Sequence, residues 1–320
     1  MMRLAILDDY QHAALSLANW DSLKPEVTVQ TFHDTLTNED QLVERLRDFE
    51  IIVAMRERTK FPRTLIERLP KLKLMITTGW RNVSIDSKAL AERGIPFCGT
   101  HMLHSSTMEL AWGLILALAR DIVGQSQTIR QGRWQTNLGN VVQGKVLGTV
   151  GLGSLGSQVA AVAKAFKMEV IAWSQNLTAE RAASIGVERV EKDELFRRSD
   201  FVTIHLVLSQ RTRGLIGAHE LSLMKPTAYL INTSRGPIVD EQALFNTLKN
   251  RKIAGAAIDV YSEEPIPNNH PFLSLDNALL TPHLGYVTEE GLRNAYGEAV
   301  EDVRAFLNGK PVRVVGTEWK

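Results

Sequence analysis

Three side chains that could bind an anion or move a proton stand directly after three apolar runs in the second half of the chain. Arg235 follows AYLIN, Glu264 (with Glu263 before it) follows AGAAIDV, and His283 follows ALLT. In an open parallel sheet, ligands bind beyond the carboxyl ends of the strands, so we expect these residues on one rim. An arginine fork can bind carboxylate and carbonyl oxygens together, and a histidine can exchange a proton near neutral pH. A neighbouring carboxylate favours the imidazolium and orients it.

Each of these residues also has an ordinary structural interpretation. Arg235 could pair with a surface carboxylate, since most arginines are solvated. Glu263 and Glu264 could be a charged pair in a turn, and His283 could close a loop. The occurrence of all of them at one rim favours the catalytic interpretation.

A glycine-rich turn is predicted at the same rim. The apolar run VLGTV leads into Gly151-Leu152-Gly153-Ser154-Leu155-Gly156, and an Ala/Val-rich helical pattern follows. In a dinucleotide site the first glycine makes the turn, the second lets the backbone approach a pyrophosphate, and the third lets the helix pack closely. Free N–H groups at the helix start would bind the phosphates. The pattern predicts a dinucleotide site, and we include Ser154 and Leu155 in it.

Alternating strands and helices must position these residues, which predicts an α/β fold with parallel sheets. We expect two doubly wound domains, a flavodoxin-like substrate domain and a Rossmann dinucleotide-binding domain, with a cleft between them. The first should contain residues 1–99 plus 286–320, because the helical pattern 288–308 is expected to return to it; the second should contain 100–285. The expected strands are 3–7, 27–32, 51–55, 72–78, 96–98, 146–150, 169–173, 201–207, 228–232, 254–260 and 278–281, and the main helices are 38–49, 62–69, 86–93, 106–122, 154–167, 178–185, 192–198 and 240–250.

One helix and the segment after it stand apart from this alternation. Residues 106–122 are apolar nearly all round, which suits a buried helix at the join between two domains. The polar segment 124–144 is expected to wrap the surface.

The composition is that of an ordinary globular protein, with 44% hydrophobic residues and a net charge of +1 over 320 residues. No basic excess suggests nucleic acid or an anionic membrane as a partner. The single cysteine, Cys98, excludes an internal disulfide and suits a reducing compartment. The start of the chain is interpreted as a buried strand rather than a signal peptide, and we expect a cytoplasmic protein. His101 and His104 lack a third ligand, so no metal site is predicted.

Several ordered motifs make the chain resemble the D-isomer-specific 2-hydroxyacid dehydrogenases, a family that includes phosphoglycerate, formate and glyoxylate-reducing enzymes. The resemblance extends over most of the chain. It is carried by TTGWRNVSID (77–86), MELAWGLILAL (108–118), GLGSLG (151–156), HLVLSQRTRGLIG (205–217), LINTSRGPIVDEQAL (230–244), AGAAIDVYSEEP (254–265) and NALLTPHLG (277–285).

The resemblance implies that Arg235, Glu264 and His283 are the catalytic set of an NAD(P)-dependent oxidoreductase. Its substrate would be a small 2-oxo or 2-hydroxy acid of the D series, with Arg235 binding the carboxylate and His283 acting as acid and base. A formate- or phosphite-type dehydrogenase and an NAD(H)-sensing corepressor are the alternatives. The resemblance also implies a homodimer built around 106–122 and the Trp134 segment.

The nicotinamide cofactor could be NAD or NADP. An NAD-selective site usually has an acid after the second strand, where it binds the ribose 2′-OH. Here that position is Ser174, followed by Gln175 and Asn176, and no arginine stands beside it. The other expected cofactor contacts are His205, Val207 (usually Pro in the family), Thr233, Asp259 and Gly285.

The substrate domain also departs from the usual family pattern. Gly79 is followed by Trp80 and Arg81, where relatives often carry small residues, and Arg56 follows the third strand. We interpret these four residues as candidate substrate contacts, which would suit an acidic or phosphorylated substrate. Surface arginines and a packed tryptophan are the ordinary alternative.

Overall fold

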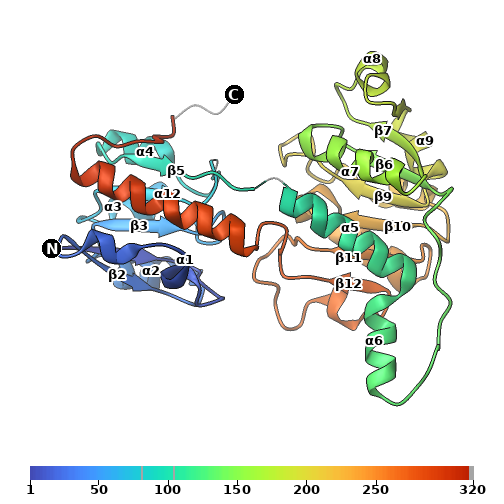
Figure 1. Ribbon diagram of the computed structural model, residues 1–320, viewed down its shortest axis with the longest axis horizontal. Coiled ribbons are helices and arrows are strands. Elements are labelled where there is room, and N and C mark those ends of the chain that lie inside the picture. Colours follow the sequence, from blue (N-terminus) through green and yellow to red (C-terminus); the bar gives the residue numbers. More distant parts are fainter. Residues whose placement is uncertain (81, 104, 317–320) are drawn as a thin grey trace. The chain divides into compact units, whose positions relative to one another are not determined.

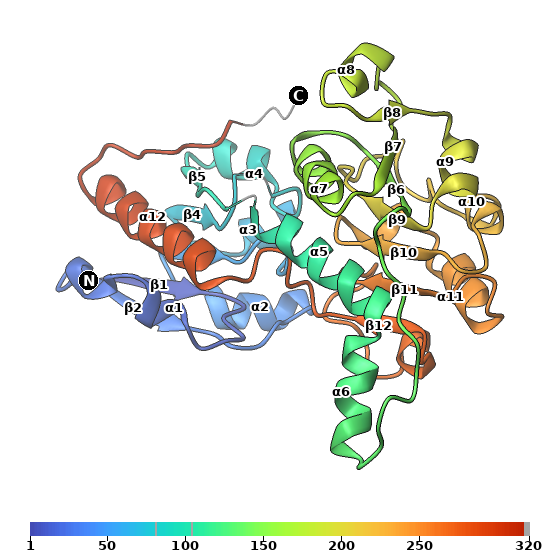
Figure 2. The same ribbon diagram turned by 45° about the vertical axis from the view of Figure 1, so that its right-hand side comes forward.

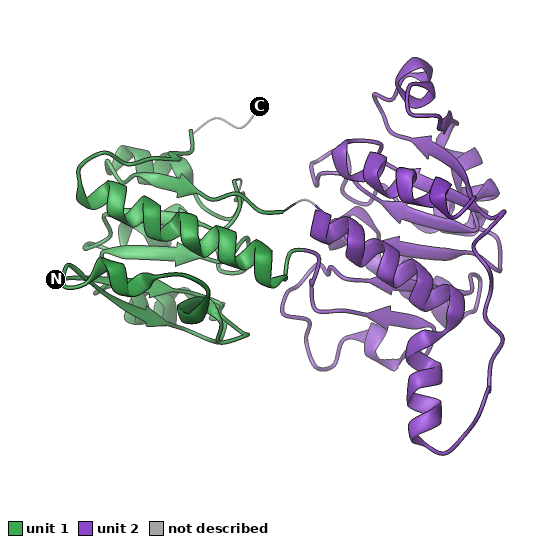
Figure 3. Ribbon diagram, in the orientation of Figure 1, with its two compact units in different colours: residues 1–103, 286–320 green, residues 104–285 purple. Residues whose placement is uncertain are grey.

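The computed structural model describes residues 1–80, 82–103 and 105–316, which form two compact units (Figures 1 and 3). Unit 1 contains residues 1–103 and 286–320, and unit 2 contains residues 104–285. Residues 100–103, expected in the second domain, therefore lie in unit 1. Thr100 explains this placement: its N–H donates to the carbonyl of Thr77 at 3.1 Å, and its hydroxyl accepts from the N–H of Gly79 at 3.1 Å.

Unit 1 is built on a five-stranded, entirely parallel sheet in the order β2-β1-β3-β4-β5. This is the flavodoxin-like order, which confirms the fold class expected for this half. Strands β3 and β4 are buried at every position, as expected for apolar runs covered on both faces. The strands are β1 (Met2–Ile6), β2 (Val27–Thr31), β3 (Ile51–Ala54), β4 (Leu74–Thr77) and β5 (Phe97–Gly99).

Two helices of unit 1 begin at the capping side chains Asn38 and Asp86. The Asn38 side chain accepts from the N–H of Gln41, and the Asp86 side chain accepts from the N–H of Ala89. The last helix packs against α1 and β4, so the end of the chain completes this unit. The helices are α1 (Ala14–Leu17), α2 (Glu39–Leu46), α3 (Arg63–Glu67), α4 (Ser87–Glu92) and α12 (Glu289–Leu307), with a 3₁₀ turn η1 (Trp20–Leu23).

Unit 2 contains a seven-stranded parallel sheet in the order β12-β11-β10-β9-β6-β7-β8 (Figure 2). Counted from β6, this is the 3-2-1-4-5-6 order of a Rossmann domain extended by one strand, which confirms the predicted fold class. The sequence predicted six of these seven strands and did not predict the two-residue β8. The strands are β6 (Val146–Val150), β7 (Glu169–Trp173), β8 (Glu188–Arg189), β9 (Phe201–Ile204), β10 (Tyr229–Asn232), β11 (Gly255–Ile258) and β12 (Ala278–Leu280).

The helices of unit 2 correct one expectation and add one element. Residues 124–144 were expected to wrap the surface and no helix was predicted there, but α6 covers their first part; in Figure 2 it continues from the end of α5 at an angle. The break falls at Asp121, whose φ of 50° cannot continue α5. Helix α10 was not predicted; the Glu220 carboxylate caps its start by accepting from the N–H of Gly217 at 2.9 Å. The helices are α5 (Ser105–Arg120), α6 (Ile122–Arg130), α7 (Ser154–Ala165), α8 (Ala179–Ala183), α9 (Lys192–Arg198), α10 (Ala218–Leu223) and α11 (Glu241–Lys249), with η2 (Gly236–Ile238) and η3 (Pro271–Ser274).

Within the described ranges, no helix combines the length and the apolar character needed to cross a membrane. The same residues contain no cluster of three or more His, Cys, Asp or Glu side chains arranged to hold a metal ion. His104 lies outside the described residues.

Candidate active site

The glycine turn of unit 2 has the close packing that its sequence requires. Gly151 has a φ of +102°, and a Cβ there would overlap the carbonyl oxygen of His205. A Cβ at Gly156 would overlap the carbonyl oxygen of Gly151, so the first turn of α7 rests directly on the loop. Gly153 faces open space, with no atom within 4 Å of the position of a Cβ. The second glycine therefore leaves its backbone accessible, while the other two close the turn.

Two buried polar atoms at the same end of this sheet have no hydrogen-bond partner among the described residues. They are Nδ1 of His205, after β9, and the hydroxyl oxygen of Thr233, after β10. The other ring nitrogen of His205 lies 3.0 Å from the hydroxyl of Thr203, and burial lowers the pKa of His205 to about 4. Buried polar atoms are nearly always satisfied, so such atoms at a rim indicate the place of a ligand. Both residues were predicted cofactor contacts.

Asp259 holds the turn that carries His283. This fully buried carboxylate accepts hydrogen bonds from the hydroxyl of Thr281 at 2.6 Å and from the N–H groups of Leu284 at 2.7 Å and Gly285 at 3.0 Å. Burial raises its pKa, an effect that these bonds partly offset. The bonds fix the backbone on both sides of His283, which has a φ of 54°. Asp259 therefore orients the histidine through the main chain.

His283 and Glu264 form a direct pair. Nδ1 of His283 lies 2.6 Å from Oε2 of Glu264, and Oε1 of Glu264 accepts from the N–H of Tyr261 at 2.8 Å. Because an ionised carboxylate only accepts, the imidazole donates to it from Nδ1. This is the arrangement of a general acid–base histidine with an orienting carboxylate. Glu263 makes no such pair among the interactions of the described residues.

Arg235 lies in a braced turn after β10. The Asn232 side chain donates to the carbonyl of Arg235 at 3.1 Å and accepts from the N–H of Ser234 at 3.0 Å. The guanidinium donates to the carbonyl of Ser234 at 2.8 Å. A Cβ at Gly236 would overlap the backbone of Tyr261, so this turn packs directly on the turn that carries Glu264. The structure thus brings the arginine turn against the turn of Tyr261 and Glu264.

The 174–176 segment adjoins the glycine turn. The N–H of Gly151 donates to the carbonyl of Trp173 at 2.8 Å, which places Ser174 immediately beyond the paired end of β7. Gln175 and Asn176 are exposed, as is Val207, which follows β9. No carboxylate occurs among residues 174–176.

The predicted substrate contacts follow β3 and β4 in unit 1. Arg56 lies over Gly79, where a Cβ would overlap its guanidinium, and Gly79 has a φ of +100°. The guanidinium carbon of Arg56 lies 5.7 Å from the centroid of the Tyr286 ring, and that of Arg58 lies 5.6 Å from it. Trp80 is 42% exposed and stacks on His101. Arg81 lies outside the described residues.

Sequence reasoning missed several supporting residues. Thr281 bonds Asp259, and Tyr261 places its hydroxyl 3.0 Å from the carbonyls of both Ile258 and Thr281. On α5, the hydroxyl of Thr107 donates to the carbonyl of Gly285 at 2.8 Å. The sequence offered one signal for Tyr286, since it directly follows Gly285, a predicted cofactor contact. The Thr107 contact joins residues 178 positions apart, so no local pattern could reveal it.

Comparison with known proteins gives a consistent result. Residues 112–285 match the family model described as D-isomer specific 2-hydroxyacid dehydrogenase, NAD binding domain. The chain is 39% identical to a D-3-phosphoglycerate dehydrogenase of Methanocaldococcus jannaschii, over 85% of this chain and 52% of that protein. It is 37% identical to a glyoxylate reductase of Thermococcus litoralis, over 84% of each. The chain therefore spans about half the length of the first relative and most of the second.

Solved structures show the same similarity. The crystal structure of a phosphoglycerate oxidoreductase from Vibrio cholerae o395 superposes with a TM-score of 0.92 at 35% identity, covering 97% of this chain and 100% of that one. An acyclic imino acid reductase in complex with NADPH and D-Arg is 28% identical, with a TM-score of 0.76, and covers 98% of this chain and 100% of that one.

Proposed function

Because the chain belongs to the D-isomer-specific 2-hydroxyacid dehydrogenase family, we propose that it transfers a hydride between a nicotinamide cofactor and a small 2-oxo or 2-hydroxy acid of the D series. The observation that carries the proposal is the 2.6 Å contact between His283 and Glu264. The turn that contains Glu264 packs against the turn that contains Arg235. Unit 2 is then the dinucleotide-binding domain, and unit 1 is the substrate domain.

The residues of the proposed catalytic set have different roles. Arg235 binds the substrate carboxylate and polarises the carbonyl oxygen with its planar fork. His283 donates the proton on Nε2 to that oxygen during reduction and takes it back during oxidation. Glu264 accepts from Nδ1, favours the imidazolium that must form and fixes the ring. Asp259 is a positioning residue for the His283 turn.

The residues of unit 2 suit a dinucleotide. The open position at Gly153 and the start of α7 would receive the pyrophosphate. His205 Nδ1 and the Thr233 hydroxyl offer polar atoms at the same end of the sheet that lack a partner among the described residues. When bound, the nicotinamide supplies or accepts the hydride.

We further propose that this site uses NADPH as well as NADH. Ser174, Gln175 and Asn176 adjoin the glycine turn and carry no negative charge. A carboxylate there would repel a 2′-phosphate, whereas hydroxyl and amide groups can donate to it. The same groups can bind a ribose hydroxyl, so neither cofactor is rejected.

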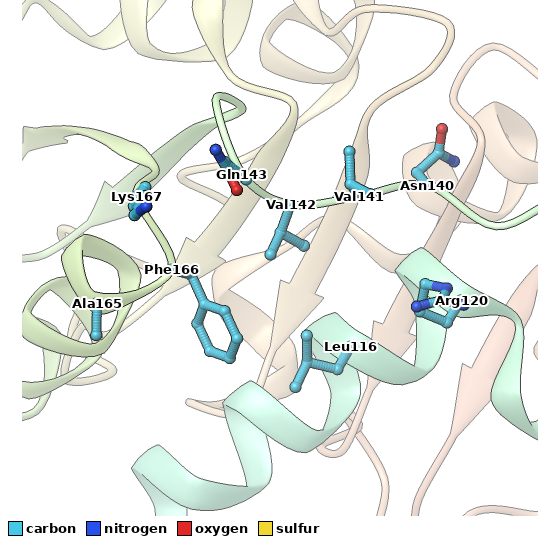
Figure 4. A pocket seen from close by; sticks show the side chains of 9 residues that line it. All are labelled: Leu116, Arg120, Asn140, Val141, Val142, Gln143, Ala165, Phe166 and Lys167. Atoms are coloured by element: carbon cyan, nitrogen blue, oxygen red, sulfur yellow. The ribbon is translucent and has the colours of Figure 1, made fainter.

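The proposed enzyme works as a homodimer. Several apolar side chains between residues 122 and 141 are strongly exposed, among them Trp134 at 73%, Leu138 at 93% and Val141 at 69%. A hollow of about 330 Å³ opens beside this segment, with Leu116, Val142 and Phe166 in its wall and Arg120 and Lys167 at its edges (Figure 4). A group of exposed apolar side chains beside a hollow is typical of a protein–protein interface. A second copy of the chain is the proposed partner.

A steady-state assay tests the proposed reaction. The enzyme is mixed with NADH or NADPH and with glyoxylate, pyruvate, hydroxypyruvate or phenylpyruvate, and the loss of cofactor absorbance is followed. We expect oxidation of the cofactor with at least one of these 2-oxo acids. Pyruvate, hydroxypyruvate and phenylpyruvate should give the D-hydroxy acid, identified by chiral chromatography, whereas glycolate formed from glyoxylate has no stereocentre. No turnover with any of the four, or formation of the L-isomer, would refute the proposal.

A further inference from the structure

A second histidine–glutamate pair lies in unit 1, at the carboxyl ends of its strands. Nδ1 of His101 lies 3.0 Å and 3.2 Å from the two carboxylate oxygens of Glu298, and the backbone N–H of His101 donates to the same carboxylate at 2.6 Å. Asn294 donates from its side chain to the carbonyl of His101 at 3.0 Å. Asn294 and Glu298 are four residues apart on α12, so one helix face holds the ring and both backbone groups of His101.

This fixed histidine supports the indole of Trp80. The two rings stack with centroids 5.0 Å apart and an interplanar angle of 25°. His101 stacks on the indole, and Trp80 as a whole remains 42% exposed. A large aromatic residue held in this way keeps an apolar surface open at low entropic cost, because its orientation is already set.

The position of Trp80 relates it to ligand binding. It follows β4, which lies between β3 and β5, and ligands of open parallel sheets bind beyond such strand ends. The guanidinium of Arg56 occupies the space that a Cβ on the neighbouring Gly79 would take. The cationic side chains nearby already face negative charge: Arg56 Nε lies 3.8 Å from Glu57, and Arg58 interacts with Asp8. Trp80 supplies the exposed apolar surface beside these two arginines.

We propose that Trp80, seated on the His101–Glu298 pair, determines the substrate side chain and selects 2-oxo acids with an aromatic side chain. The proposal rests on the proposed function, because it concerns the substrate of that same site. The aromatic ring of the substrate stacks on the exposed part of the indole, and His101 and Glu298 act as positioning residues.

The test compares phenylpyruvate with glyoxylate, which has no side chain, in the wild type and in Trp80→Val. We expect kcat/KM for phenylpyruvate to fall about tenfold or more in the variant, mainly through KM, as the loss of an aromatic stack predicts. The value for glyoxylate should change by less than about threefold. Val83→Ala is the matched control, since Val83 is exposed in the same loop and should leave the ratio of the two substrates unchanged.

The positioning role is tested by Glu298→Gln and by His101→Phe. The Phe variant keeps a ring under the indole and should retain most of the phenylpyruvate preference, whereas His101→Ala should lose it; melting temperatures check that all variants fold. An unchanged or increased preference in Trp80→Val would overturn the proposal, and so would a wild-type preference for a 2-oxo acid with an anionic side chain.

A failure of the proposed function has a different signature. If the wild type turns over none of these acids, calorimetric binding of phenylpyruvate replaces turnover. Weaker binding to Trp80→Val than to the wild type would then support stacking of the substrate ring on Trp80, and equal binding would refute it.

Discussion

The Nδ1 atom of His283 lies 2.6 Å from Oε2 of Glu264, and the second oxygen of that carboxylate is held by the N–H of Tyr261. The carboxylate is thus fixed before it orients the ring. Asp259 fixes the backbone around the ring independently, through Thr281, Leu284 and Gly285. The histidine is oriented from its side chain and from its main chain.

Replacement of this histidine should remove acid–base catalysis. We expect His283→Ala to lower kcat by roughly 10²–10⁴-fold, because no other group supplies the proton, while the Kd of the cofactor changes little. His219→Ala is the control, since His219 is an exposed histidine on α10 paired with Asp193. Steady-state kinetics and cofactor titration measure the two effects, and full activity of His283→Ala would disprove its assignment.

The planar fork of Arg235 should matter beyond its charge. Arg235→Lys keeps the positive charge but loses the paired N–H donors, so kcat/KM for the 2-oxo acid should fall by roughly 10–100-fold. Arg251→Lys changes a solvent-exposed ion pair with Asp276 in the same unit and should have no effect. A wild-type value for Arg235→Lys would mean that the carboxylate is bound elsewhere.

A carboxylate at position 174 should restore selectivity for NADH. In Ser174→Asp, repulsion of the 2′-phosphate should lower kcat/KM for NADPH by roughly tenfold or more, while the value for NADH stays equal or rises. Ser222→Asp introduces the same charge on α10 and should leave the ratio of the two values unchanged. Equal losses with both cofactors would indicate that residue 174 does not lie at the ribose.

Asp302 should make the stability of the protein depend on pH. It is fully buried on α12, its nearest charged neighbours are Arg313, Glu298 and Glu301, and burial raises its pKa from 3.8 to about 7. The folded state then keeps a proton that the unfolded chain releases, so this carboxyl favours folding most below about pH 4, and its contribution falls as the pH rises to about 7.

Urea unfolding at pH 5 and pH 8 measures this effect. Asp302→Asn should reduce the difference between the free energies of unfolding at the two pH values, because its side chain does not titrate. Glu301→Gln removes an exposed partner of the same Arg313 and should leave most of the difference in place. An identical pH dependence in the wild type and Asp302→Asn would contradict the burial argument.

A charge in the exposed apolar segment should separate the proposed dimer. Leu138→Asp places a carboxylate at a side chain that is 93% exposed, so the fold of the monomer should be unaffected. Light scattering should give twice the mass of the chain for the wild type and a single mass for the variant. Leu15→Asp, at an exposed position on α1, should remain dimeric. A monomeric wild type would refute the proposed assembly.

The sequence by itself determined the fold class and the place of each candidate residue along the chain. Apolar runs such as IIVA in β3 and the spacing of Gly151, Gly153 and Gly156 are local patterns, and local patterns suffice to predict strands, turns and the order of elements. Local reasoning failed at α6 and α10, where the apolar periodicity is weak and Asp121 and Glu220 set the helix boundaries.

Only the tertiary structure decided which side chains meet. The contact between His283 and Glu264 joins residues 19 positions apart, Thr107 reaches Gly285 across 178 positions, and Glu298 holds His101 across 197. Such contacts depend on the sheet order and on the return of α12 to unit 1, which no short window of sequence contains. Only the fold shows that polar atoms of His205 and Thr233 have no hydrogen-bond partner among the described residues, because this depends on every residue around them.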